Sequence, residues 1–259
     1  MLLTISILTA LVFSVLYPLC FLISAKDPLK NNFHRFHLGL PCVVGGIVTS
    51  TLSLLPPQIS PEGRTLVMIW FIQIFFLTRY FWHRGPPNPY VVTLVCLVGL
   101  AAFVDIHYEL VGPNVRAIFL SILSGFILVS AIYAMNLGHW YLNVHGLPIA
   151  HLMRAVYVFW AFVFFRAAWD IGLLTAGKVL YHGDTIPLYQ FIGNFEGFFL
   201  LMAITFGTIF PLITLYFVRG TLLVKSTQSA TGILYVILVA VLIGELTFKY
   251  YLIKFGIIL

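Results

Sequence analysis

Charged residues are scarce in this chain. Aspartate, glutamate, lysine and arginine make up 8% of its 259 residues, whereas 61% are hydrophobic. A soluble domain carries about 25% charged residues, so the composition excludes an ordinary soluble protein. The apolar residues form long unbroken stretches rather than the short alternating segments of a membrane β-barrel. The sequence therefore predicts an all-α integral membrane protein that has the lipid bilayer as its main partner.

Several common functional motifs are also missing. The three cysteines (Cys20, Cys42 and Cys96) form no CxxC or CxxCH pattern, which argues against a disulfide framework and a covalently attached haem. There is no Walker A loop, GxSxG, HExxH or DDxxD motif, so neither ATP hydrolysis nor the common hydrolase chemistries are indicated. The net charge of +6 comes from scattered residues at the ends of apolar stretches, where they contact lipid head groups. We therefore exclude nucleic-acid binding.

Apolar stretches of about 18 residues or more are long enough to cross a bilayer, and the sequence contains eight of them. The connections are short and rich in proline and glycine, without a soluble domain or a visible repeat, so we predict a single polytopic transmembrane helical domain over 1–259. The first stretch has no preceding basic residue and no cleavage site, as expected for a retained span. The predicted spans are 2–24, 38–55, 65–82, 90–111, 115–138, 152–177, 188–218 and 230–253.

The seventh stretch, 188–218, is longer than one span requires and contains Pro211. A proline inside a helix removes a backbone donor and kinks the helix, and an overlong span can tilt in the bilayer. We therefore expect this span to be tilted, to be kinked, or to begin with a turn at the interface.

Lysine and arginine are distributed unevenly between the two sides of the predicted bundle. The connections after spans one, three, five and seven hold twice as many as those on the opposite side. Because the basic side faces the cytoplasm, both termini are predicted on the exterior side. The plasma (inner) membrane of a bacterium or archaeon is the predicted location. The basic residues of the cytoplasmic side are Lys26, Lys30, Arg35, Arg79, Arg84, Arg154, Arg219 and Lys225.

A first candidate site consists of charged residues within or at the ends of the predicted spans, toward the exterior. Such charges are costly unless they are paired or hydrated. The pairs Arg166–Asp170 and Glu245–Lys249 are four residues apart and share a helix face, so they can be structural ion pairs. As a set, these residues instead favour a pathway for protons, ions or quinone chemistry. The pathway candidates are Asp105, Glu109, Arg166, Asp170, Glu196 and Glu245.

Asp105 and Glu109 are a special case within this set because they are four residues apart on one helix and carry the same charge. Two adjacent carboxylates repel each other unless one is protonated or a cation lies between them. We therefore expect a compensating group beside this pair.

A second candidate site consists of histidines on the predicted cytoplasmic side. Two imidazoles from different helices can ligate a b-type haem, and nearby cations can pair with its propionates. The residues match no zinc signature, and they can equally be ordinary residues of the membrane boundary. The predicted ligands are His37, His83, His139 and His151, with His139 and His151 as the leading iron ligands, and the propionate partners are Arg35, Arg79, Arg84 and Arg154.

Three hypotheses for the function follow from these two sites. The first is a respiratory-type redox component with a b-type haem near the cytoplasmic boundary and an outer carboxylate cluster for proton or quinone chemistry. The second is a proton- or cation-coupled membrane carrier. The third is a lipid-modifying enzyme or a non-catalytic subunit of a membrane complex, so whether the chain is an enzyme stays open.

Overall fold

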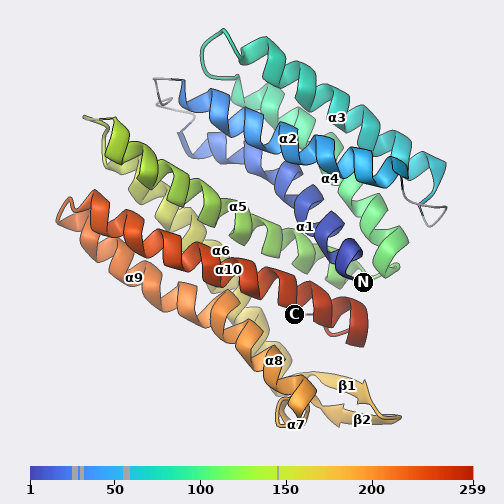
Figure 1. The fold of residues 1–259 in the computed structure, drawn as a ribbon. Coiled ribbons are helices and arrows are strands. Elements are labelled where there is room, and N and C mark those ends of the chain that lie inside the picture. Colours follow the sequence, from blue (N-terminus) through green and yellow to red (C-terminus); the bar gives the residue numbers. More distant parts are fainter. Residues whose placement is uncertain (25–28, 30–31, 55–58, 145, 259) are drawn as a thin grey trace. The chain divides into compact units, whose positions relative to one another are not determined.

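The computed structural model describes residues 1–24, 29, 32–54, 59–144 and 146–258, and it is 84% helical (Figure 1). Within these residues, eight helical segments are long and apolar enough to cross a membrane. The predicted helical class and the eight long apolar helices are therefore confirmed. Lys26 and Lys30, two of the basic residues of the predicted cytoplasmic side, lie outside the described residues.

The chain forms two compact units, an N-terminal unit (Leu2–Ile118) and a C-terminal unit (Phe119–Leu259). The prediction of one functional domain over 1–259 stays a prediction.

The N-terminal unit is a ring of four helices. The first packs against the second and the fourth, the second against the third, and the third against the fourth. The first helix tightens into a 3₁₀ segment at Tyr17, directly before Pro18, which has no backbone N–H to donate. The elements are α1 (Leu2–Leu16), η1 (Tyr17–Ser24), α2 (Phe33–Leu54), α3 (Pro61–Phe81) and α4 (Pro89–Val111).

Trp70 of α3 is the largest fully buried side chain of the structure, at 1% exposure. Glycines make room for it on the two neighbouring helices. A Cβ atom at Gly45 of α2 would lie 2.9 Å from its ring, and one at Gly99 of α4 would collide with its indole nitrogen. The ring is therefore enclosed from both sides, and it fixes α3 between α2 and α4.

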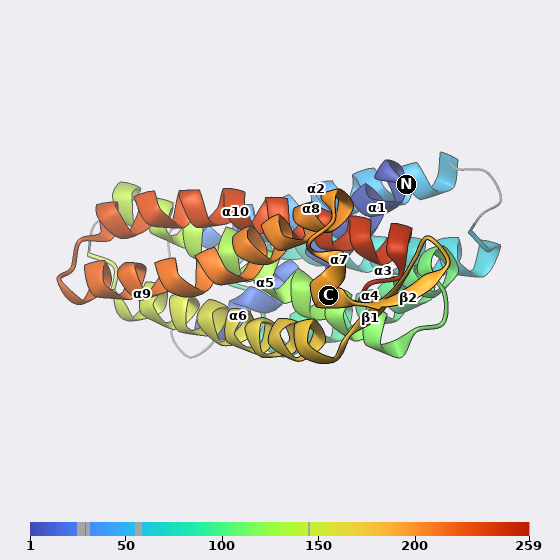
Figure 2. The same ribbon diagram turned by 90° about the horizontal axis from the view of Figure 1, so that it is seen from below.

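The C-terminal unit contains four long helical segments and a β-hairpin. Figure 2 shows α9 between α6 and α10, in agreement with the helix contacts. The hairpin turn contains His182 and Gly183, both with positive φ, as a type I′ turn requires. The elements are α5 (Val115–Asn143, which begins in the N-terminal unit), α6 (Ala150–Ala176), β1 (Lys178–Tyr181), β2 (Asp184–Pro187), α7 (Leu188–Phe191), α8 (Phe195–Ile204), the π-helix η2 (Thr205–Ile209), α9 (Phe210–Leu223) and α10 (Thr227–Phe255).

Helix α5 packs against α6 and α10 within the C-terminal unit. Phe126 stacks on Phe162 of α6 with 4.9 Å between the ring centroids. A Cβ atom at Gly138 would lie 2.7 Å from the hydroxyl of Thr231 on α10. These contacts bring the middle of α5 against the two helices that carry the buried charges.

Several predicted spans differ from the structure. Helix α2 begins at Phe33, five residues before the predicted start, so that His37 lies inside the helix rather than just before it. Helix α5 continues to Asn143, five residues beyond the predicted end, so that His139 lies inside this helix. The predicted span 188–218 is divided into α7, α8, η2 and α9. A short turn thus precedes the long segment, and the helix is distorted directly before Pro211.

Candidate functional site

The carboxylate of Asp170 is held from two elements of the C-terminal unit. On α6, Arg166 Nε donates to Asp170 Oδ1 over 3.0 Å. The hydroxyl of Thr208, in the π-helix η2, donates to Asp170 Oδ2 over 2.7 Å. All three residues are at most 2% exposed. Because this interior has a low dielectric, the pairing between Arg166 and Asp170 is what makes both charges tolerable there.

A second buried ion pair lies on α10. Lys249 donates to Glu245 Oε1, and the hydroxyl of Ser124 on α5 donates to Glu245 Oε2. Glu245 and Lys249 are each 2% exposed. The arrangement repeats that of Asp170, since one carboxylate oxygen pairs with a cation one helical turn away and the other accepts a hydroxyl from a neighbouring element.

Phe248 connects the two ion pairs. It lies on α10 between Glu245 and Lys249, and the guanidinium carbon of Arg166 lies 3.9 Å from the centroid of its ring. A cation over an aromatic face is attracted by the ring quadrupole, more strongly when water is excluded. Phe248 thus links the two buried ion pairs, and we call these residues the charge cluster: Arg166, Asp170, Glu245 and Lys249, with Thr208, Ser124 and Phe248.

Arg166 does not use all of its hydrogen-bond donors within the described residues. Its terminal nitrogens Nη1 and Nη2 are buried and have no hydrogen-bond partner among the described residues. A buried polar group without a partner costs about 1–3 kcal/mol, and such groups normally bind ordered water or a ligand. Among the described residues, the charge cluster therefore lacks a hydrogen-bond acceptor for the terminal nitrogens of Arg166. Each of these nitrogens can donate a hydrogen bond to an oxygen atom.

The backbone around Thr208 is irregular. In η2 the N–H of Phe210 donates to the carbonyl of Thr205, the five-residue spacing of a π-helix, and π-helical turns occur frequently at functional sites. Gly207 and Gly244 make the approach of η2 to α10 close, since a Cβ atom at Gly244 would collide with the backbone of Gly207. The π-turn thus places Thr208 against Asp170 while Gly207 lies against Phe248.

Glu196 lies apart from the charge cluster. It is in the first turn of α8, and its carboxylate pairs with Lys254 Nζ over 3.0 Å with both side chains partly exposed, at 37% and 40%. Its main-chain carbonyl accepts the hydroxyl of Tyr251. The structure therefore places this candidate residue at an exposed end of its unit, where solvent screens the pair.

Asp105 and Glu109 lie near the end of α4 in the N-terminal unit, where they contact the beginning of α3. Glu109 accepts the backbone N–H of Ser60 over 3.0 Å and also its hydroxyl, while Ser60 caps the helix at Gly63 N. Oxygens of Asp105 and Glu109 lie 2.9 and 3.1 Å from where a Cβ atom of Gly63 would be. The first turn of α3 thus lies against both carboxylates, and Ser60 donates two hydrogen bonds to Glu109.

The predicted haem ligands of the N-terminal unit differ in their surroundings. His37 is 2% exposed, and its Nδ1 lies 2.7 Å from the hydroxyl of Tyr17. The centroid of its ring lies 3.9 Å from the ring centroid of Phe33. His83 is exposed, at the end of α3. Arg35, Arg79 and Arg84 are also in this unit.

The predicted ligands of the C-terminal unit make separate contacts. His139 Nδ1 lies 3.2 Å from the hydroxyl of Tyr235. His151, at 2% exposure, lies 2.9 Å from the guanidinium of Arg154. Among the described residues, no group of three or more His, Cys, Asp or Glu side chains is arranged to hold a metal ion. A b-type haem needs only two imidazoles, so the haem hypothesis stays a prediction.

Comparison of the chain with protein-family models, with curated proteins and with solved structures gives no match.

Sequence reasoning found the two ion pairs through their four-residue spacing but missed three members of the charge cluster, Ser124, Thr208 and Phe248. A signal for Thr208 was present, since a hydroxyl and a glycine stand just before Pro211 in an otherwise apolar stretch. Ser124 and Phe248 join the cluster through tertiary contacts, for which the sequence carries no local pattern.

We predict that Asp170→Asn destabilises the protein by about 3–5 kcal/mol, because it leaves the Arg166 charge buried without a counter-charge. The double variant Arg166→Gln/Asp170→Asn should recover most of this loss, since the buried charge is removed with its partner. Unfolding in detergent measures both, and Asp184→Asn, at an exposed position of the hairpin, is the control. A single variant as stable as this control would contradict the account.

Proposed function

We propose that the chain is a proton-coupled membrane carrier and that its proton pathway runs through the charge cluster of the C-terminal unit. The observation that supports this proposal is the incomplete pairing of the cluster. Two carboxylates buried to 2% exposure are each paired with one cation, and the partner of Asp170 still has two unsatisfied nitrogens.

Asp170 and Glu245 are the proton-accepting groups of this pathway. When a carboxylate takes up a proton, its charge is lost and the adjacent cation must find another negative partner or water, because an isolated buried charge is strongly disfavoured. A protonation step is therefore coupled to a rearrangement of Arg166 or Lys249. Such coupling is what a carrier requires to link proton movement to a change in its structure.

Thr208 and Ser124 extend the pathway beyond the carboxylates. A hydroxyl can donate one hydrogen bond and accept others, so each can pass a proton between water and the carboxylate oxygen that it contacts. The π-turn and the glycine contact between Gly207 and Gly244 provide the local irregularity at which η2 adjusts to this rearrangement. Arg166 acts as the counter-charge.

The orientation and location belong to the same proposal. Both termini face the exterior, the basic connections face the cytoplasm, and the protein resides in the plasma membrane of a bacterium or archaeon. Reporter fusions to the loop at Lys225 and to the hairpin at Asp184 should report opposite sides of the membrane.

The redox hypothesis is the alternative, and it makes a separate prediction. If the chain binds a b-type haem, the purified protein shows a Soret band that shifts on reduction, and the band is lost in His139→Ala or His151→Ala. A colourless protein that contains no iron would contradict this hypothesis and leave the carrier proposal untouched. Quinone or additional subunits as partners would be identified by analysing what co-purifies.

The carrier proposal is tested with purified protein in liposomes that contain a pH-sensitive dye, with a potassium gradient and valinomycin to set the voltage. The wild-type protein should dissipate the pH gradient faster than protein-free liposomes. We predict that Glu245→Gln/Lys249→Gln and Arg166→Gln/Asp170→Asn fold but fall to the protein-free rate, because they keep the hydrogen-bonding groups and lose the proton-accepting carboxylate.

Asp184→Asn is the matched control and should retain the wild-type rate. Folded double variants that retain the wild-type rate would show that the ion pairs only hold the helices together, and they would overturn the proposal.

A further inference from the structure

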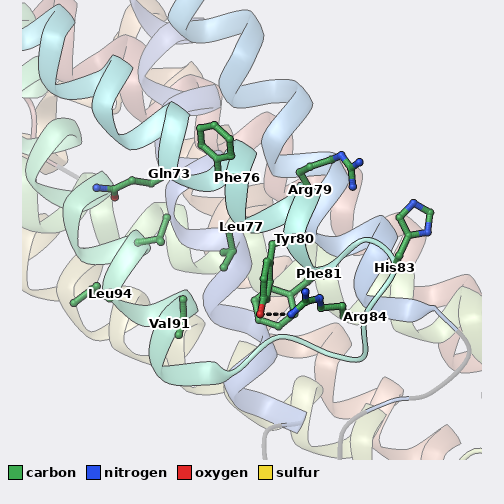
Figure 3. Close-up of a pocket in the computed structure, with 11 residues that line it drawn as sticks. Gln73, Phe76, Leu77, Arg79, Tyr80, Phe81, His83, Arg84, Val91 and Leu94 are labelled. Atoms are coloured by element: carbon green, nitrogen blue, oxygen red, sulfur yellow. Dashed lines mark hydrogen bonds between the residues drawn. The ribbon is translucent and has the colours of Figure 1, made fainter.

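A groove of about 940 Å³ follows the seam between α3 and α4 in the N-terminal unit (Figure 3). One end is basic and the remainder is mostly apolar. In Figure 3, Arg84 is turned toward Tyr80 beyond the end of α3, whereas Arg79 and His83 point in the other direction. The basic end is formed by Arg79, His83 and Arg84, and the wall by Gln73, Phe76, Leu77, Tyr80, Phe81, Val91, Leu94 and Val95.

The basic end of the groove is free to bind an anion. Arg79 and Arg84 are exposed, no carboxylate among the described residues pairs with either of them, and no acidic residue lines the groove. Arg84 is held in place by Tyr80, whose ring lies 3.9 Å from its guanidinium carbon and whose hydroxyl it contacts. A guanidinium held in this way suits a phosphate group, which arginine binds through paired hydrogen bonds.

The apolar wall has the length of a lipid chain in one leaflet. From Gln73 to the end of α3 at Phe81 the helix rises by about 12 Å, and half of the hydrocarbon core of a bilayer is about 15 Å. Phe76 and Leu94 are 64% and 66% exposed, so they offer apolar surface rather than being buried within the unit. A phosphate at Arg84 would thus carry its chains along this wall.

We propose that this groove binds an anionic phospholipid, with its phosphate on Arg84 and an acyl chain along Phe76 and Leu94. Free phosphate would use only the basic end, and a neutral isoprenoid would use only the wall. The combination of both in one continuous groove is what favours a phospholipid. This site is separate from the charge cluster and does not depend on the carrier proposal.

The test uses spin-labelled phosphatidylglycerol and phosphatidylcholine with the full-length protein in vesicles. Wild-type protein should prefer phosphatidylglycerol, and Arg79→Gln/Arg84→Gln should reduce that preference by about 30-fold, as expected for the loss of two cations near a lipid head group. Arg116→Gln, an exposed arginine outside the groove, is the control and should keep the preference.

A second variant tests the apolar wall without changing the charge. Leu94→Trp fills the groove and should weaken the immobilisation of both lipids, whereas Leu97→Trp, at an exposed leucine of the same helix outside the groove, should not. Loss of binding in Leu94→Trp alone would indicate a neutral lipid and overturn the proposal. Full displacement of the lipid by inorganic phosphate, with no effect of Leu94→Trp, would indicate a phosphate site and also overturn it.

Discussion

The pairing of opposite charges inside the C-terminal unit is the constraint on which the rest of the site depends. Arg166, Asp170, Glu245 and Lys249 are buried to 2% exposure or less, in a chain with very few charged residues. None of these charges is tolerable alone in an apolar interior. The hydroxyls, the aromatic ring and the close glycine contact around them all serve to bring these four groups together and to satisfy their oxygens.

The long helices were predictable because a bilayer imposes a simple rule. About 20 consecutive apolar residues are needed to cross it, and every backbone group must be bonded within the helix. The hydropathy of the sequence did not predict features that depend on local backbone geometry. The early start of α2 at Phe33, the hairpin turn at His182 and Gly183, and the π-helix before Pro211 each involve only a few residues, and hydropathy does not detect them.

The candidate site was predictable only in part. The Arg166–Asp170 and Glu245–Lys249 pairs follow from helical periodicity, which the sequence displays directly. Their connection through Phe248, and the hydroxyl contacts of the carboxylates, join residues far apart in the chain. Glu196 has the same chemical character as the other acids, yet it lies in an exposed pair with Lys254. Residue type alone could not separate it from the charge cluster.

The central claim is that Asp170 and Glu245 exchange protons while the protein stays folded. Infrared difference spectroscopy after a pH jump measures this directly, because a protonated carboxylic acid has a C=O stretching band that a carboxylate lacks. The account predicts such a band in the wild-type protein, reduced in Arg166→Gln/Asp170→Asn and in Glu245→Gln/Lys249→Gln and kept in Asp184→Asn. A pH jump that produces no carboxylic acid band, or a band that both double variants retain, would contradict the account.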